Sequence, residues 1–234
     1  MTKKYGALFL VGLLSLSLLT GCGNSSNNSS ATPSPSPSVI QTATPAPAAE
    51  ATPPTNGVWQ DRTFTNTWAN YSFTLPKKWS KISVADLKKQ IGTTSFLFNE
   101  DATQSQVIHM NDAAAYYDCG ILSSDVRSNV LICFENLARS PLKDTITEDL
   151  YFAAIVPQLK ATGQYSSIDE DPSDYTLAGQ SYRRLTARHA NSNATQWYLA
   201  RRQGDIMICW IVTVTDSEQK DMESFLQSIS SVQP

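Results

Sequence analysis

The sequence predicts an α+β domain in which an antiparallel sheet of six to eight strands is sandwiched by helices. Most of the chain after Gly57 alternates apolar and polar residues with a period of two, which is typical of half-buried strands. The run Ile206–Val214 is apolar on both faces, which indicates a central strand covered from both sides. The last segment, Ser217–Ile229, places Phe225 and Leu226 on one apolar stripe, which suits a helix lying across that sheet.

The first 22 residues are typical of an export signal. Lys3 and Lys4 precede an apolar run at Gly6–Leu19 that is too short to span a bilayer comfortably, and Cys22 follows after two small residues. The segment LTGC at residues 19–22 resembles the lipobox of bacterial lipoproteins at all four positions. This resemblance implies removal of residues 1–21, lipidation of Cys22 and anchoring at the extracytoplasmic face of a bacterial cell membrane. The alternative is a plain transmembrane anchor with an incidental cysteine.

Residues 22–56 form a compositionally distinct segment. They are rich in Asn, Ser, Thr and Pro, contain only Glu50 as a charged residue, and hold seven of the twelve prolines between Pro33 and Pro54. Such a composition cannot repay the entropy of ordering, so we expect a disordered, extended tether. A proline motif that binds an aromatic groove is the alternative.

Residues 57–234 are long enough for one sizeable core and are expected to form a single globular domain. Only Lys3, Lys4 and Glu50 carry charge before this point, so the domain keeps a net charge of −4. A mildly acidic balance argues against a nucleic-acid partner, and the few Cys and His residues leave little material for a metal cluster. We expect no cofactor and no metal.

The first half of the domain is predicted to hold two hairpins and two helices. In chain order, we expect strands at Val58–Phe64 and Asn70–Leu75, a helix from Ser83 to Ile91, and a further helical turn before Asp112. Strands Ala114–Leu122 and Asn129–Asn136 flank a polar turn at residues 123–128. A helix from Thr147 to Thr162 should stop at Gly163, and Pro157 predicts a kink or an early end.

The last third is predicted to be a meander followed by the final helix. The expected strands are Tyr165–Ile168, Tyr175–Leu177, Ser181–His189, Thr195–Arg202 and Ile206–Thr215. Asp216 or Ser217 is the expected cap of the helix that follows.

Several segments resemble PsbP-like domains of bacterial lipoproteins. They are Trp59, residues 64–79 (FTNTWANYSFTLPKKW), Val130–Leu137, Leu177–Arg183 and the closing strand and helix. The resemblance covers roughly residues 58–231 and implies the fold shared by PsbP photosystem subunits and the Mog family of Ran-binding proteins. It implies no catalytic residues, since that fold mostly hosts binding and assembly roles. We interpret Trp68, Tyr71, Phe73 and Trp79 as core residues rather than as a ligand platform.

The sequence contains no recognisable catalytic motif, which favours a non-enzymatic role. His109 and His189 lie far apart without ligand-like neighbours, so we interpret both as ordinary strand or surface residues. The acidic run at residues 169–174 fails the EF-hand pattern and is expected to be a solvated loop.

Two further patterns suggest a disulfide and an anion-binding site. Cys119 and Cys133 are equidistant from Val126, so a symmetric hairpin would place them opposite each other within disulfide reach; the alternative is that they and Cys209 are buried free thiols. Five arginines fall in one predicted hairpin, and they need compensating anions that are either internal carboxylates or an external acidic partner. These arginines are Arg183, Arg184, Arg188, Arg201 and Arg202.

Together these features predict a surface-tethered lipoprotein whose domain binds or assembles with a protein or an anionic wall polymer. The alternative is a small exported hydrolase or wall-active enzyme whose active site is built from dispersed residues.

Overall fold

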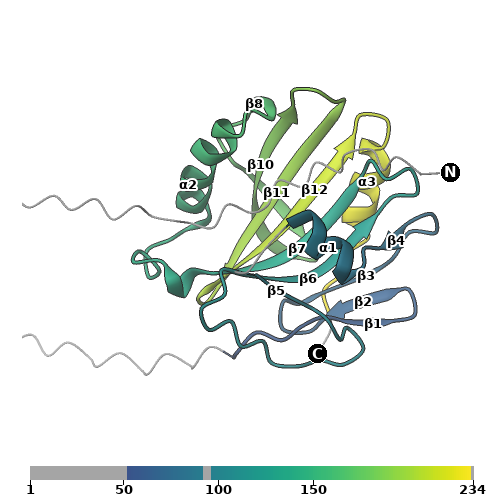
Figure 1. Cartoon of the computed structure of the whole chain (residues 1–234), viewed down its shortest axis with the longest axis vertical. Helices are drawn as coiled ribbons and strands as arrows, with labels where there is room; N and C mark the ends of the chain where they lie inside the picture. The colour runs from purple at the N-terminus through teal and green to yellow at the C-terminus, as the bar shows by residue number, and fades with distance from the viewer. Residues whose placement is uncertain (1–51, 92–95, 233–234) are drawn as a thin grey trace, which may run out of the picture.

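The computed structural model describes residues 52–91 and 96–232 (Figure 1). The signal segment, Cys22 and most of the tether lie outside the described residues, so lipidation at Cys22 stays a prediction. No helix within the described residues is long and apolar enough to cross a membrane.

A large sheet forms the centre of the domain, and nine strands of it fall within the described residues. Its main path runs in the order β4-β6-β7-β12-β11-β10-β8, while β5 pairs with β6 and β9 pairs with β10. The strands are β4 (Ser80–Lys81), β5 (Phe96–Phe98), β6 (Ala115–Leu122), β7 (Asn129–Asn136), β8 (Tyr165–Ile168), β9 (Ser173–Leu177), β10 (Gln180–His189), β11 (Ala194–Gln203) and β12 (Ile206–Thr215). All pairings in it are antiparallel except that of β5 with β6.

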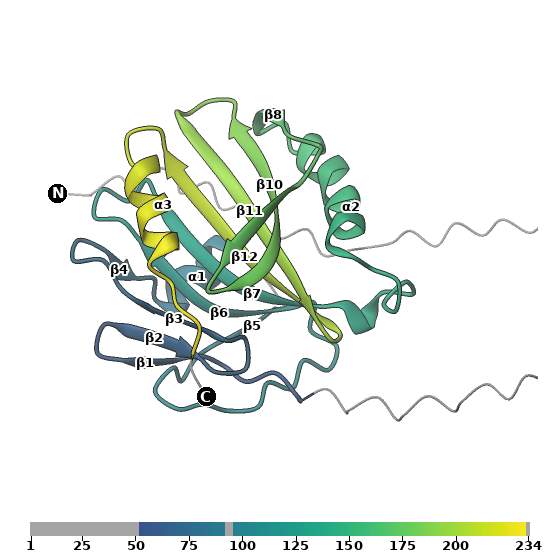
Figure 2. The same ribbon diagram turned by 180° about the vertical axis from the view of Figure 1, so that it is seen from behind.

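Different layers cover the two faces of this sheet, as Figures 1 and 2 show. On the α3 face lie α3 (Gln219–Gln227) and a small sheet of β1 (Val58–Gln60), β2 (Thr63–Asn66) and β3 (Tyr71–Thr74). On the α2 face lie α1 (Val84–Ile91) and α2 (Glu148–Ala161). A short 3₁₀ helix, η1 (Leu137–Arg139), follows β7. The α+β class with a helix-covered antiparallel sheet is therefore confirmed.

Strand β12 is the central strand, as its sequence indicated. It lies between β7 and β11, and residues Ile206–Val214 are all buried. Alternate side chains enter the two separate cores: Trp210 packs on the α3 face, whereas Cys209 and Ile211 pack on the α2 face. A strand covered on both faces has no polar side to present, which explains its continuous apolar run.

Helix α2 shows how local sequence sets the ends of an element. The Thr147 hydroxyl accepts a hydrogen bond from the backbone N–H of Leu150 at the N-cap, and Gly163 has a φ of 65° just beyond the last turn. The helix continues through Pro157 to Ala161, so it does not end early at the proline.

Three expectations for individual strands and helices were wrong. The segment Val58–Phe64 is not one strand, because Asp61 adopts a φ of 52° and reverses the chain between β1 and β2. Residues 96–112 contain the short strand β5 and an irregular loop instead of further helical turns. Helix α3 begins after Glu218 without a side-chain cap, because the Asp216 carboxylate accepts from Arg188 instead.

The predicted pairing of Cys119 with Cys133 was also wrong. The polar turn places Leu122 opposite Asn129, which puts Ile132 opposite Cys119. A bulge then inserts Asp118 as an extra residue, so that Tyr117 faces Cys133. Cys119 consequently packs on the α3 face and Cys133 on the α2 face, and all three cysteines of the domain are free.

Candidate functional site

Three adjoining hollows lie along the segment 97–111. This segment contains most of the loop between β5 and β6 (Figure 1). We call this segment and its hollows the loop surface. The first hollow, near Trp59, has a volume of about 240 Å³, the second, near Leu97, about 280 Å³, and the third, near Pro54, about 420 Å³. The first two share Asn99 and Glu100, and the last two share Ile108 and His109.

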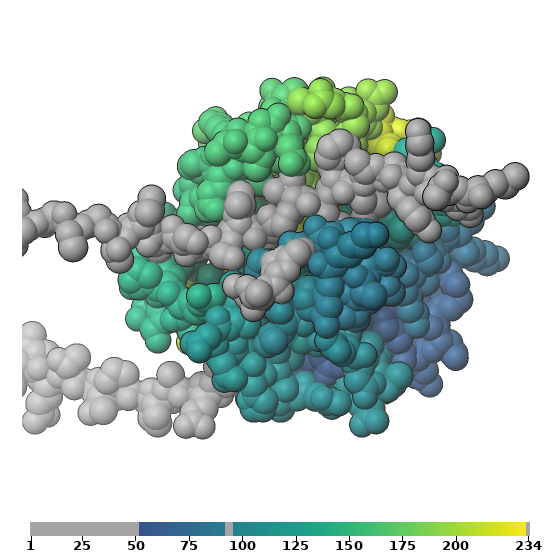
Figure 3. Space-filling model, in the orientation of Figure 1, coloured from purple at the N-terminus to yellow at the C-terminus, as the bar shows by residue number. Residues whose placement is uncertain are grey.

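Exposed apolar side chains accompany these hollows. Leu97 is 39% exposed and Val107 is 45% exposed, and both line the second hollow. The teal segment near residue 100 lies at the front of the molecule in the space-filling view (Figure 3). A contiguous surface that is both hollowed and apolar is typical of interaction sites.

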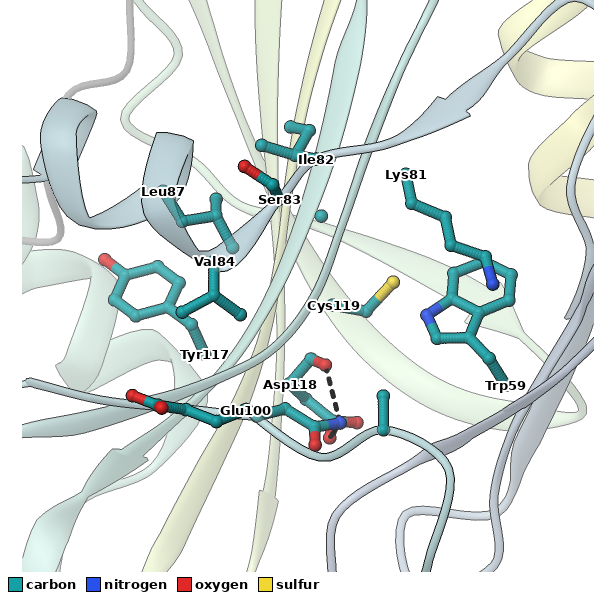
Figure 4. A pocket seen from close by; sticks show the side chains of 13 residues that line it. Trp59, Lys81, Ile82, Ser83, Val84, Leu87, Glu100, Tyr117, Asp118 and Cys119 are labelled. Atoms are coloured by element: carbon teal, nitrogen blue, oxygen red, sulfur yellow. Dashed lines mark hydrogen bonds between the residues drawn. The ribbon is translucent and has the colours of Figure 1, made fainter.

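The Trp59 hollow combines an aliphatic wall with a cationic rim (Figure 4). Ile82, Val84 and Leu87 form the wall where β4 leads into α1. The Lys81 ammonium lies 4.1 Å from the centroid of the Trp59 ring, in a cation–π contact. This geometry places a positive charge over the Trp59 ring at a hollow that Glu100 also lines.

Buried amide side chains hold the loop of this surface in place. The Asn56 Nδ2 atom donates to Asn99 Oδ1 at 3.0 Å and to the Gln104 carbonyl at 2.9 Å, while Asn56 Oδ1 accepts from the Gln106 backbone N–H. Asn99 Nδ2 donates in turn to the Gly57 carbonyl at 2.9 Å. A loop fixed in this way loses little further entropy on binding a partner.

Asp118 connects this loop to the small sheet. Its carboxylate accepts from the Gly57 backbone N–H at 2.7 Å, from Asn66 Nδ2 at 2.9 Å and from the Tyr71 hydroxyl at 2.8 Å. Asn99 Nδ2 adds a longer contact of 3.4 Å. Position 57 requires glycine, because a Cβ there would lie 2.2 Å from the Phe64 ring. The bulge in β6 thus points a buried carboxylate at donors from three segments.

Burial raises the pKa of Asp118 to about 6, and the hydrogen bonds from its four donors oppose that rise. Because all four donors belong to the fold itself, the carboxylate is committed to holding the small sheet and the loop together. We therefore assign Asp118 a structural role beneath the loop surface.

A second buried carboxyl, Glu135, lies on the α2 face. Burial raises its pKa to about 7, and the Tyr151 hydroxyl is its hydrogen-bond partner. Its Oε1 atom has no partner. Glu135 is separated from the loop surface, since Tyr151 and α2 enclose it.

The five arginines of the predicted cluster have acceptors within the chain. Arg183 contacts Asp149 and Asp174, Arg188 binds Asp216 with both terminal nitrogens, and Arg184 lies 3.6 Å from Glu223. Backbone carbonyls accept from the other two: Ala69 from Arg201, and Ile146 and Gly204 from Arg202. Arg183, Arg184 and Arg188 therefore have carboxylates of this chain beside them, whereas the side chains of Arg201 and Arg202 contact neutral backbone carbonyls. An external acidic partner for the cluster stays a prediction.

The remaining sequence candidates are dispersed. His109 lines two hollows of the loop surface, whereas His189 is buried against Tyr165, and burial lowers its pKa. In the acidic run, Glu170 pairs with Lys160 and Asp174 with Arg183. Among the described residues, no group of three or more His, Cys, Asp or Glu side chains is arranged to hold a metal ion.

Sequence reasoning missed the residues that build the loop surface. One signal was present, because Asp118 is the only charged residue within the apolar strand run 114–122. A buried charge needs partners, so this residue indicated a polar node. Its partners Asn66 and Asn99 gave no such signal, since asparagine is common in turns.

No model of a known protein family matches the chain, and no curated protein matches it. Among solved structures, a cyanobacterial PsbP (CyanoP) from Synechocystis is 9% identical, with 80% of this chain and 98% of that chain covered and a TM-score of 0.44. LpqN, described as involved in cell envelope biogenesis of Mycobacterium tuberculosis, is 11% identical, with 70% of this chain and 83% of that chain covered and a TM-score of 0.34. A protein of Bacteroides thetaiotaomicron is 14% identical, with 75% of this chain but only half of that chain covered and a TM-score of 0.34.

One of these structures is described as a PsbP. At TM-scores below 0.5 the similarities transfer no residue role, and the fold class rests on the strands and helices of this chain.

Proposed function

We propose that this protein is a surface-tethered lipoprotein, held at the extracytoplasmic face of a bacterial membrane through Cys22, whose domain docks a partner protein on the loop surface. The lipobox and the tether support the anchoring. The observation that carries the docking is the row of three adjoining hollows on a loop fixed by buried amides.

The size and chemistry of the hollows favour a protein as the partner. Sites for small molecules usually span about 300–1,000 Å³, and two of the three hollows lie below that range. Cavities of this size accept one or two side chains each. The Lys81 and Trp59 pair suits an acidic or aromatic side chain, and Leu97 and Val107 suit an apolar one.

An anionic wall polymer is the less favoured partner, because three of the five arginines that would bind it already lie beside carboxylates of this chain. The Arg188 guanidinium already binds Asp216 with both terminal nitrogens, and Arg183 lies between two carboxylates. A non-catalytic role is supported by the two carboxyls with raised pKa values, since Asp118 is committed to four donors and Glu135 is enclosed by α2.

The experiment that tests this proposal is site-specific photocrosslinking of the full chain in intact producing cells. A photoreactive residue replaces Leu97 or Val107 in turn, and Leu150 of α2, which is 55% exposed, serves as the matched apolar control. We expect one discrete adduct from Leu97 and Val107 and none from Leu150. Trp59→Ala and Lys81→Glu should each weaken that adduct several-fold.

The anchoring is tested in the same cells with Cys22→Ala. We expect the variant to carry no acyl chain, because the lipid thioether needs the Cys22 sulfur, and the mass of the purified protein measures this. Equal adducts from all three positions, or no adduct at all, would refute docking on the loop surface. An acyl chain still present on the Cys22→Ala protein would refute lipid attachment at Cys22 and leave the docking result standing.

A further inference from the structure

Cys133 and Cys209 lie directly opposite each other at the centre of the sheet. They are register partners on the neighbouring strands β7 and β12, and both side chains enter the core of the α2 face. Opposed residues of antiparallel strands have Cα atoms about 4.5–5.5 Å apart, which falls inside the range that a disulfide requires. The hairpin symmetry that suggested Cys119 as the partner of Cys133 therefore selected the wrong strand.

The surroundings of the two thiols are compatible with a bond between them. The Cys133 thiol is hydrogen-bonded to Cys209, so the sulfur atoms already face each other. The Tyr151 hydroxyl contacts Cys209 Sγ at 3.1 Å from the side of α2. Cys133 is 0% exposed and Cys209 is 4% exposed, so forming the bond moves no surface group.

We propose that Cys133 and Cys209 form a cross-strand disulfide, a modification site that joins the two central strands β7 and β12. The oxidant is a small-molecule disulfide of the glutathione type. One cysteine thiolate attacks it, forms a mixed disulfide and releases one thiol; the second cysteine then attacks the protein-bound sulfur and releases the other thiol. The protein loses two hydrogen atoms, and the oxidant gains them as two thiols.

Burial determines when this reaction takes place. Desolvation raises the pKa of the Cys133 thiol well above its ordinary value, so the folded protein presents almost no thiolate to an oxidant. The bond therefore forms while the chain folds, before α2 covers the pair. Once formed, it is enclosed in the α2-face core and protected from reductants.

The test is to refold the reduced, denatured full chain in detergent with a mixture of oxidised and reduced glutathione, and with reduced glutathione alone. Far-UV circular dichroism confirms refolding. After alkylation, tryptic peptides are mapped by mass spectrometry without reduction. The three domain cysteines fall in separate peptides, namely 90–127 for Cys119, 128–139 for Cys133 and 203–220 for Cys209.

We expect most molecules refolded with oxidised glutathione to yield peptide 128–139 linked to peptide 203–220, with Cys119 alkylated. The oxidised protein should unfold at a higher denaturant midpoint than the reduced one, because the link constrains the unfolded chain. Cys119→Ser should leave the linked peptide intact, whereas Cys209→Ser should abolish it. Three alkylated cysteines after oxidative refolding to the native spectrum, or a link that involves Cys119, would overturn the proposal.

Discussion

Asp118 and Glu135 are two buried carboxyl groups on the neighbouring strands β6 and β7, and they differ in what surrounds them. Asp118 is the extra residue of a bulge and accepts from four donors. Glu135 lies in regular register opposite Met207, has Tyr151 as its hydrogen-bond partner and keeps one oxygen without a partner. Burial is the largest cause of the raised pKa of both carboxyls. The pKa is about 6 at Asp118 and about 7 at Glu135.

The comparison shows that a buried carboxylate organises a fold only when donors converge on it. Removing Asp118 would leave donors from three segments unpaired, whereas neutralising Glu135 would remove an unfavourable charge. The bulge makes this difference, because it frees Asp118 from the strict alternation that points Glu135 into the α2-face core.

The largest expected effect is that of Asp118→Ala. The substitution leaves the Gly57 N–H and the Tyr71 hydroxyl without their acceptor in the core, and it removes one of the two acceptors of Asn66 Nδ2, which keeps the Thr55 carbonyl. We expect the free energy of unfolding at pH 7 to fall by about 3–5 kcal/mol. Urea denaturation followed by tryptophan fluorescence measures this change. A loss below about 1 kcal/mol would show that the hydrogen bonds to Asp118 do not hold the small sheet in place.

The second effect concerns the pH dependence of stability through Glu135. Its folded pKa of about 7 lies above the unfolded value, so the folded protein binds the proton more tightly. Its contribution is therefore fully present below about pH 4.5 and is lost as the pH rises through about 7. A pKa shift from 4.5 to about 7 corresponds to a change of about 3 kcal/mol in the free energy of unfolding.

Glu135→Gln isolates this contribution, because the difference in unfolding free energy between the two proteins cancels all other titrations. We expect the variant to become more stable than the wild type as the pH rises from 5 to 8. Asp118 titrates in the same direction at about 6 in both proteins, so the variant should still lose stability between about pH 4 and 6. A difference that does not change with pH would contradict the assignment.

The smallest effect is expected from Tyr71→Phe, which removes one of the four donors to Asp118 and leaves the ring in place. The expected loss is about 2 kcal/mol at pH 7, where Asp118 is ionised, and less at pH 5. Tyr116→Phe is the matched control, since the charge of Asp118 acts on Tyr116 but Tyr116 is not one of the four hydrogen-bond donors to Asp118. Thermal or urea unfolding of both variants at the two pH values checks this prediction, and equal losses for both would contradict it.

The sequence predicted regular elements well because their signals are local. The predicted strand Tyr165–Ile168 and the double-sided apolar run at Ile206–Thr215 have the observed bounds. Thr147 and Gly163 marked the ends of α2 to within a residue. Each of these signals depends on neighbours a few residues away, so no tertiary information was needed.

The candidate site was decided by contacts between distant segments. Asp118 accepts hydrogen bonds from Asn66 and Tyr71, which are 52 and 47 residues away in the sequence. Asn56 donates to the backbone carbonyl of Gln104, which is 48 residues away. The register of the β6–β7 turn, with Leu122 opposite Asn129, placed Cys119 and Cys133 on opposite faces, and only the register of β7 with β12 placed Cys209 beside Cys133.

The sequence by itself thus determined the α+β class, the order of most strands and which residues are buried, because hydrophobic periodicity selects one face of each element. The tertiary structure alone decided which buried polar groups meet, which cysteines face each other and where the surface is hollowed. The physical reason is that a bulge or a register shift of one residue costs little in local propensity and yet changes every long-range contact of a strand.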